Sequence, residues 1–251
     1  MRSKKAAASA SGFAAAFACA ALALAQAPTP LLKPFGGAQS TQLREPWRIE
    51  TLEKLPRHTR FEVVPLEGKL VLRVSADASY ANLVHPVNAY GAALRWRWRV
   101  ERMSLATDLA RKSGDDVPAR LCVLFDVPLE RLDAAERWKL RLGRFLFGAE
   151  LPPAGVCYVW DARLPAGTWL PNAYTDRVQM LVLRSAASGH AQSHWYEESR
   201  DVRADFAQAF PVEARDGPVP IAAVAVSADG DDTGAVSIAY FDDVVLEPPL
   251  P

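Results

Sequence analysis

The chain has 251 residues, half of them hydrophobic, and its 29 basic and 29 acidic side chains cancel to a formal net charge of zero. This balance argues against general nucleic-acid binding, which requires a strong excess of basic residues. The length is enough for a sizeable core and suits one β-domain, since sandwiches of this size often remain undivided.

Residues 1–25 have the features of a secretory signal peptide. Three basic residues precede an Ala-rich apolar run that ends at Ala23-Leu24-Ala25, a small-x-small cleavage pattern. Cleavage there removes three positive charges and leaves 26 basic and 29 acidic residues, a net charge of −3. We therefore expect a periplasmic or secreted protein with no stable membrane span after cleavage. A retained anchor is one alternative, because the run is about long enough to cross a bilayer, and lipidation of Cys19 is another.

The remainder is divided into a leader, one domain and a tail. Residues 26–45 are rich in Pro, Gly and Ala and are expected to form a flexible leader, and residues 248–251 a frayed tail. Residues 46–247 contain ten β-type runs separated by turn formers, which predicts a mainly β domain built as an antiparallel two-sheet β-sandwich or jelly roll. The runs are Phe61–Val64, Lys69–Ser75, Tyr80–Val84, Ala92–Glu101, Ala119–Val127, Val156–Asp161, Arg177–Arg184, Ser193–Glu197, Ile221–Ala228 and Ala235–Glu247.

The clearest strand signal is the run between Leu94 and Val100, in which three arginines alternate with two tryptophans. A period of two places alternate residues on opposite faces of a strand. We therefore predict that Trp96 and Trp98 lie in the core and that the arginines form the opposite face. That face is either a solvated sheet surface or a contact surface for anionic or hydroxyl-rich partners.

Two helical insertions are expected. Apolar residues recur at steps of three and four between Leu129 and Phe147, as on one face of a helix. Residues Asp201–Phe210 are predicted to form a shorter helix with Asp201 as its N-cap.

Two adjacent acids, Asp242 and Asp243, occupy the last predicted strand. In a regular strand they fall on opposite faces, so one of them is expected to point inward or to lie at an edge. An inward carboxylate needs a partner, because an unpaired buried charge is costly, and one of the arginines is the natural candidate.

Two polar clusters supply candidate ligand-binding residues. In the first, a loop that precedes a strand, adjacent carboxylates are flanked by a lysine and an arginine, which suits hydrogen bonding to a sugar or half of a site for a hard cation such as Ca²⁺. In the second, aromatic rings with neighbouring amide, carboxylate and guanidinium groups suit a carbohydrate platform. Both clusters are equally suited to capping and stapling loops. The candidates are Lys112, Asp115, Asp116, Arg120, Trp160, Asn172, Tyr174, Arg177, Trp195, Glu198, Arg200 and Asp201.

A third cluster, Asp229–Gly234, has the acids and glycines of a calcium loop. Its spacing does not fit an EF-hand, which needs a bidentate Glu at the twelfth position. A tight turn with glycine at positive φ explains the segment equally well. Asp229, Asp231 and Asp232 are candidate Ca²⁺ ligands, and no other cofactor is expected.

Two cysteines, Cys122 and Cys157, remain after cleavage, and each lies in a predicted strand. Export permits a disulfide, which neighbouring strands would allow. Two buried free cysteines are the alternative.

Together these motifs resemble an exported bacterial family called domain of unknown function 3047. The resemblance spans about Trp47 to Leu246 and implies a single exported β-sandwich domain, similar in style to carbohydrate-binding jelly rolls, with no established activity. The cysteines and the long insertion depart from the family's pattern. The motifs that carry the resemblance are Lys112–Asp116, Pro118–Arg120, Tyr158–Trp160, Asn172–Arg177, Glu198–Val202, Asp205–Phe206 and Asp229–Gly234.

Three functions are consistent with these patterns. The leading hypothesis is non-catalytic recognition of a saccharide or other cell-envelope ligand, because the chain contains neither a Gly-x-Ser-x-Gly elbow nor a His-Glu-x-x-His motif. A glycan-active lyase or hydrolase would need a second carboxylate across the bond from Asp115 or Asp116. That acid would come from Glu197, Glu198 or Asp201. The third hypothesis is a structural envelope-assembly factor that uses the arginine face as a protein contact.

Overall fold

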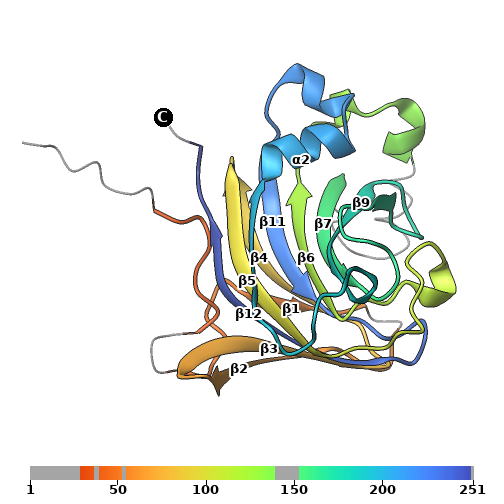
Figure 1. Cartoon of the computed structure of the whole chain (residues 1–251). Helices are drawn as coiled ribbons and strands as arrows, with labels where there is room; N and C mark the ends of the chain where they lie inside the picture. The colour runs from red at the N-terminus through yellow and green to blue at the C-terminus, as the bar shows by residue number, and fades with distance from the viewer. Residues whose placement is uncertain (1–28, 37–39, 53–54, 139–152, 250–251) are drawn as a thin grey trace, which may run out of the picture.

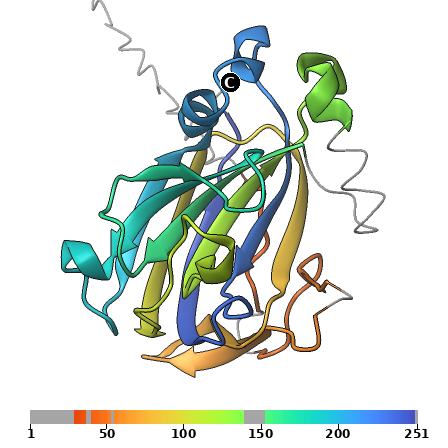
Figure 2. The ribbon, with the colours of Figure 1, turned by 90° about the vertical axis from the view of Figure 1, so that its right-hand side faces the viewer.

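The computed structural model describes residues 29–36, 40–52, 55–138 and 153–249, and the strands in this part of the chain form two sheets that share one core (Figure 1). The seven-stranded sheet has the order β1-β4-β11-β6-β7-β9-β8, and the five-stranded sheet has the order β10-β5-β12-β3-β2. Figure 2 shows the strands turned by 90° from the view of Figure 1. The first sheet contains β1 (Arg48–Glu50), β4 (Asn82–Ala89), β6 (Ala119–Phe125), β7 (Ala154–Asp161), β8 (Trp169–Pro171), β9 (Val178–Ser185) and β11 (Ile221–Ser227). The second contains β2 (Arg60–Leu66), β3 (Lys69–Asp77), β5 (Ala93–Arg102), β10 (Tyr196–Asp201) and β12 (Val236–Leu246).

The predicted mainly β, two-sheet sandwich is confirmed, and each of the ten predicted runs overlaps a strand. Two strands were not predicted, β1 and β8, because three residues are too few for an alternating pattern. One pairing differs from the expected antiparallel arrangement, since β7 and β9 run parallel. Residues 162–177 carry the chain back to the start of β7 before β9 begins, whereas a tight hairpin would have imposed antiparallel pairing.

The alternating strand β5 forms the centre of the core, as its pattern predicts. Trp96 is 2% exposed and Trp98 is fully buried. Both indoles reach the facing sheet, where Trp96 lies 5.2 Å from Tyr158 and Trp98 lies 5.9 Å from Trp160 between ring centroids. The two sheets are therefore held together by aromatic contacts that exclude water.

The opposite face of β5 is occupied by ion pairs. Arg95, Arg97 and Arg99, which alternate with the tryptophans, each have a carboxylate partner: Arg95 pairs with Glu247, Arg97 with Asp242, and Arg99 with Glu67 at 2.8 Å. The outer face of the five-stranded sheet is therefore an ion-pair ladder whose guanidinium groups are already engaged.

A β-bulge in β12 resolves the problem of the two adjacent acids. The register of β12 against β5 shifts between Asp242 and Val245, and Asp243 adopts a left-handed φ of 52°. Both carboxylates consequently lie on the arginine side of the sheet, where Asp243 is 3.3 Å from Lys69 and 3.5 Å from Arg97. Neither acid points into the core, because the extra residue of the bulge cancels the alternation.

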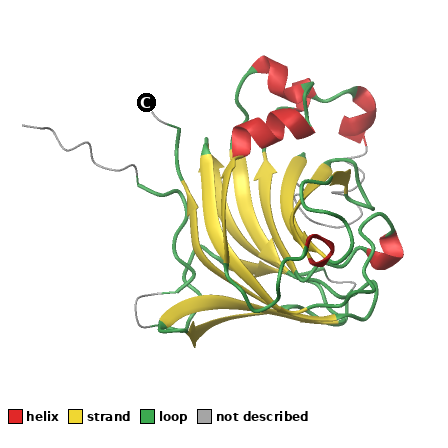
Figure 3. Cartoon of the chain, in the orientation of Figure 1, coloured by secondary structure: helices red, strands yellow, loops and turns green. Residues whose placement is uncertain are grey.

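One end of the sandwich carries the helix after Asp201, the 3-10 turn Glu213–Asp216 and the helical turns within residues 129–138, whereas the 3-10 turns Lys112–Gly114 and Ala186–Ser188 lie away from it (Figure 3). The predicted helix after Asp201 is present as α2 (Val202–Ala209), and the Asp201 carboxylate accepts hydrogen bonds from the Arg203 and Ala204 amides. The longer predicted helix begins as a 3-10 turn at Leu129–Arg131 followed by helical residues 134–138, and the rest of it, to residue 147, lies outside the described residues. In the described ranges, no helix is long and apolar enough to cross a membrane.

Residues 29–36, which belong to the predicted flexible leader, are packed on the domain. Leu32 and Phe35 are buried, and the Lys33 amide donates a hydrogen bond to Nε2 of His85 at 3.0 Å. The Trp47 indole N–H donates to the Lys33 carbonyl at 2.7 Å. Apolar side chains among the prolines explain this packing, which composition alone did not indicate. The predicted signal peptide lies outside the described residues.

Candidate functional site

Three loops that the sequence singled out, one from each polar cluster, meet beside Arg120 on the seven-stranded sheet. We call residues 112–117, 172–176 and 229–234 the three-loop cluster. The Asn172 amide donates to Oδ2 of Asp115 at 2.6 Å, which joins the first loop to the second. The Tyr174 hydroxyl donates to Oδ1 of Asp232 at 2.7 Å, which joins the second to the third. Residues 112–117 precede β6 and residues 229–234 follow β11, so both lie at the same end of these paired strands, and residues 172–176 reach them from the connection between β8 and β9.

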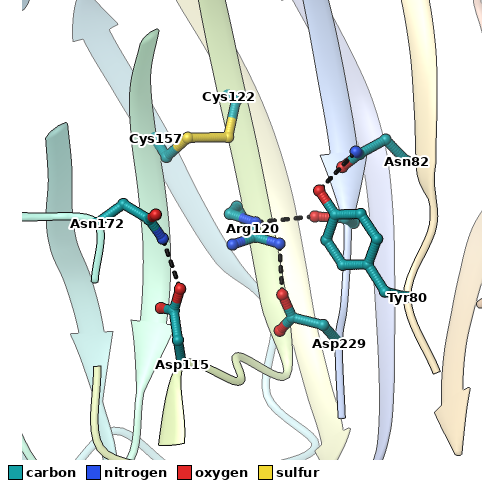
Figure 4. Close-up of a disulfide and its surroundings, with 9 residues drawn as sticks. Tyr80, Asn82, Asp115, Arg120, Cys122, Cys157, Asn172 and Asp229 are labelled. Carbon is teal, nitrogen blue, oxygen red and sulfur yellow. Dashed lines mark hydrogen bonds and ion pairs between the residues drawn. A yellow bond between two sulfur atoms is a disulfide. The ribbon is translucent and has the colours of Figure 1, made fainter. Parts of the chain in front are cut away.

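The inner side of the cluster is a buried ion pair between Arg120 and Asp229 (Figure 4). Arg120 lies near the start of β6, and its Nε donates to the Ser227 hydroxyl on β11 at 2.9 Å. The other oxygen of Asp229 accepts the Val117 amide at 2.5 Å. Burial raises the pKa of Asp229 to about 7, and the Arg120 charge opposes that shift. Such a pair fixes the loops to the sheet.

Asp116 shapes the third loop from within. It is 1% exposed, and its carboxylate accepts hydrogen bonds from the amides of Asp232 and Thr233 and from the Thr233 hydroxyl. The turn is tight at Gly230, where an added Cβ would lie 2.2 Å from the Ala235 carbonyl oxygen. Among the described residues, no group of three or more His, Cys, Asp or Glu side chains is arranged to hold a metal ion. The glycines and acids of this segment thus have identifiable roles in building the turn.

Asp115 differs from Asp116 and Asp229 in having an unsatisfied oxygen. It is 5% exposed, and its Oδ1 is buried without a hydrogen-bond partner. Burial raises the pKa of Asp115 to about 6, while the Arg120 charge and the Asn172 hydrogen bond act in the opposite direction. A buried carboxylate oxygen with no donor is the kind of group that a ligand or an ordered water normally satisfies.

The outer side of the cluster is exposed. The Tyr174 ring is 55% exposed, and the Lys112 ammonium lies 5.2 Å from its centroid. The Tyr174 hydroxyl also lies 3.2 Å from the Lys112 carbonyl oxygen. Asp231 and Asp232 flank this ring, and burial raises the pKa of both. An accessible aromatic face therefore stands among charged and amide groups.

A disulfide joins Cys122 to Cys157 on the same face of the sheet as Arg120 (Figure 4). The two cysteines are directly opposite each other in the β6–β7 ladder. The crosslink therefore fixes the strand that carries Arg120 to its neighbour.

One family model matches most of this chain. The model of the family described as protein of unknown function (DUF3047) matches residues 45–245. The chain belongs to this family. Among curated proteins no match to the chain is found. The DUF3047 segment covers both sheets and all three loops of the cluster, so the cluster lies within the family domain.

Other residues that the sequence suggested for ligand binding lie elsewhere in the DUF3047 domain. Trp160 is fully buried between the sheets, where it contacts Trp98 and Tyr196, so the structure makes it a core residue. Glu198 accepts hydrogen bonds from the Trp98 indole at 2.9 Å and from Arg184 at 2.6 Å. These side chains close the open side of the core between β9 and β10, because an indole N–H and a carboxylate inside the sandwich need partners.

The region around α2 uses two more of the predicted residues. Arg200 makes two hydrogen bonds to Asp205 on α2, and the Tyr158 hydroxyl donates to the same carboxylate at 2.7 Å. Asp201 is the N-cap of α2. Arg200 and Asp201 thus attach the helix to the edge of the five-stranded sheet, and the three-loop cluster does not include them.

Arg177 follows the second loop but turns toward the helical end. It pairs with Glu213 at 2.5 Å and with Glu136 at 2.8 Å, and its guanidinium lies 4.8 Å from the Phe210 ring centroid. These groups line a hollow of about 430 Å³. Trp195 lies on the outer face of the five-stranded sheet, 4.5 Å from the Arg97 guanidinium. Neither residue belongs to the three-loop cluster.

Sequence reasoning missed Tyr80 and Asn82, which lie beside Arg120 (Figure 4). The Asn82 amide donates to the Tyr80 hydroxyl at 2.8 Å, and the Arg120 guanidinium lies 5.7 Å from the Tyr80 ring centroid. Their spacing of two residues at the start of a predicted strand placed both on one face, which was the available signal. The identity of that face depended on the strand order.

Proposed function

We propose that this DUF3047 protein is a non-catalytic binding protein that recognises a saccharide at the three-loop cluster. The observation that carries the proposal is the exposed Tyr174 ring with Asn172, Lys112 and Asp232 around it. An aromatic face stacks on a sugar ring, and neighbouring amide, carboxylate and ammonium groups bind its hydroxyls. The buried groups behind the ring hold the loops in place, so this surface requires little ordering on binding.

The same proposal places the protein outside the cytoplasm, in the periplasm or in the medium, with residues 1–25 removed as a signal peptide. The Cys122–Cys157 disulfide supports this location, since disulfides persist in oxidising compartments. A cell-envelope glycan is the ligand class that such a location makes available.

Two alternatives receive less support. A glycan-active enzyme would need two carboxylates on either side of one bond, yet Glu198 is held by Arg184 and Asp201 caps α2. An envelope-assembly factor that binds through the arginine face would have to break ion pairs, because Arg95, Arg97 and Arg99 each have a carboxylate partner.

The test is a screen of envelope polysaccharides on a glycan array, followed by titration calorimetry with the best ligand. We expect Tyr174→Ala to weaken binding by about tenfold, as loss of an aromatic stacking contact does. The matched control is Tyr90→Ala, since Tyr90 is 49% exposed in the connection between β4 and β5. No binding to any glycan class, or equal loss in the two variants, would refute saccharide recognition at the cluster.

A further inference from the structure

Negative charge at the three-loop cluster is not balanced. Its loops and the start of β6 carry six carboxylates against two cations. The carboxylates are Asp115, Asp116, Asp176, Asp229, Asp231 and Asp232, and the cations are Lys112 and Arg120. Arg120 pairs with Asp229, and within the described ranges Lys112 makes no ion pair. Asp116 is satisfied by the loop amides. In the described part of the chain, Asp115, Asp231 and Asp232 have no ion-pair partner, so the uncompensated charge around Tyr174 lies on these three acids.

The unpartnered oxygen of Asp115 indicates what is missing. Its Oδ1 is buried and accepts no hydrogen bond, while Oδ2 accepts from Asn172. A carboxylate can only accept, so the missing group is a hydrogen-bond donor. A second carboxylate, from an acidic sugar, would be repelled by the three acids.

We propose that the ligand of the three-loop cluster is an amine-bearing saccharide whose ammonium group binds the Asp115 carboxylate. The inference rests on the proposed function and narrows its ligand class. An ammonium group supplies three donors and the positive charge that the cluster lacks. A divalent metal would need at least three carboxylate or carbonyl ligands around one point, and the described side chains offer no such group.

Burial and mutual repulsion among these acids support the same inference. Burial is the largest cause of the raised pKa of Asp115, Asp231 and Asp232, and each also feels a neighbouring carboxylate. Bound positive charge would relieve both effects. Binding of an amine is accordingly expected to strengthen as the pH rises through about 6, where Asp115 ionises.

The experiment is calorimetric titration of the full mature chain with three tetrasaccharides of similar size, built from glucosamine, N-acetylglucosamine and galacturonate. All titrations contain EDTA. We expect the glucosamine tetrasaccharide to bind at least about tenfold more tightly than the other two. In Asp115→Asn this preference should disappear, and in the control Asp77→Asn it should persist, since Asp77 is an exposed acid whose ion pair is with Arg57 at 3.6 Å. Circular dichroism confirms that each variant is folded.

Every other outcome of this experiment overturns either the amine inference or the proposed function. Equal or tighter binding of N-acetylglucosamine or galacturonate overturns the amine inference and leaves saccharide binding standing. Absence of binding by all three tetrasaccharides and by every array glycan overturns the proposed function itself. A glucosamine preference that survives in Asp115→Asn shows general electrostatic attraction and also overturns the inference. So does a rise in melting temperature with CaCl₂ alone that Asp115→Asn abolishes, because the carboxylates would then hold a metal.

Discussion

At the seam between the two sheets, the indoles of Trp96 and Trp98 face Tyr158 and Trp160, and nearly all of this surface is removed from water. At the three-loop cluster the contacts are ion pairs and hydrogen bonds between loops, and one carboxylate oxygen of Asp115 has no partner. The seam leaves the neutral indole N–H groups of Trp96 and Trp160 without partners, whereas the cluster leaves an ionisable carboxylate oxygen without one, and burial of a charged group costs more. Natural proteins tend to retain such costly groups where they function.

The largest effect is expected at the seam. Trp98→Ala would leave a cavity between the sheets and remove a partner of Glu198, so we expect it to lower the free energy of unfolding by about 3–5 kcal/mol. The control is Trp195→Ala, because Trp195 lies on the outer face of the same sheet, stacked on Arg97. Its loss should cost about 1 kcal/mol. Urea unfolding measures both, and similar losses in the two variants would contradict a dominant role for the seam.

The inner side of the cluster should give the next largest effect. Arg120→Met leaves Asp229 buried without its charge partner, so we expect a loss of about 3 kcal/mol at pH 7.5. The double variant Arg120→Met with Asp229→Asn should recover much of this loss, because an amide at 229 can still accept the Val117 N–H. Thermal and urea unfolding of the single and double variants give the coupling energy. A double variant that is no more stable than Arg120→Met would show that the ion pair is not the dominant contribution at this position.

The seam could be predicted from sequence because its signal is local. Alternation between Leu94 and Val100 decides which side chains are buried, whatever strands lie beside them. The same holds for the cap at Asp201, where one side chain satisfies amides two and three residues away. The bulge at Asp243 escaped prediction, because one residue in left-handed conformation cancels the alternation on which the argument depended.

The cluster was recognisable only as three separate loops. Their convergence depends on the pairing of β6 with β11 and on the path of the connection between β8 and β9, and no local period encodes either. Trp160 and Glu198 have the residue types of a sugar platform, but the same types close one side of the core in this fold. Composition could not distinguish these two uses, since both require an aromatic body next to a polar group.

Asp115, which is buried in the cluster, should respond to substitution in the opposite direction from the seam. The pKa of Asp115 is raised to about 6 in the fold, so the folded state favours the protonated form. The contribution of Asp115 to the free energy of unfolding is therefore fully present below about pH 4 and is lost as the pH rises toward 6. Asp115→Asn keeps an acceptor for Asn172 and removes this loss, so we expect it to raise the free energy of unfolding by about 1 kcal/mol at pH 7.5. Urea unfolding at pH 4.5 and 7.5 tests this. A variant that is less stable than the wild type at pH 7.5 would contradict the idea that the ionised carboxylate is unfavourable.

The smallest effect is expected where residues 29–36 pack on the domain. His85 is buried, its Nδ1 lies 2.7 Å from the Pro86 carbonyl oxygen, and its Nε2 accepts the Lys33 amide. Nδ1 therefore carries the proton of the neutral ring, and a second proton on Nε2 would place two donors against each other. Burial lowers the pKa of His85, and the nearby positive charge of Lys33 adds to that shift.

The sign of the pH dependence follows from this geometry. Because the pKa of His85 is lowered in the fold, its contribution to the free energy of unfolding is fully present above about pH 6.5 and is lost as the pH falls below that value. Local opening should precede global unfolding, because the Lys33 amide loses its acceptor first. We expect the protection factor of the Lys33 amide, measured by hydrogen exchange, to fall by severalfold between pH 7 and 5 while amides of β5 stay protected. His85→Gln keeps a neutral acceptor and should abolish the fall. An equal fall in that variant would mean that acid loosens this segment through another group.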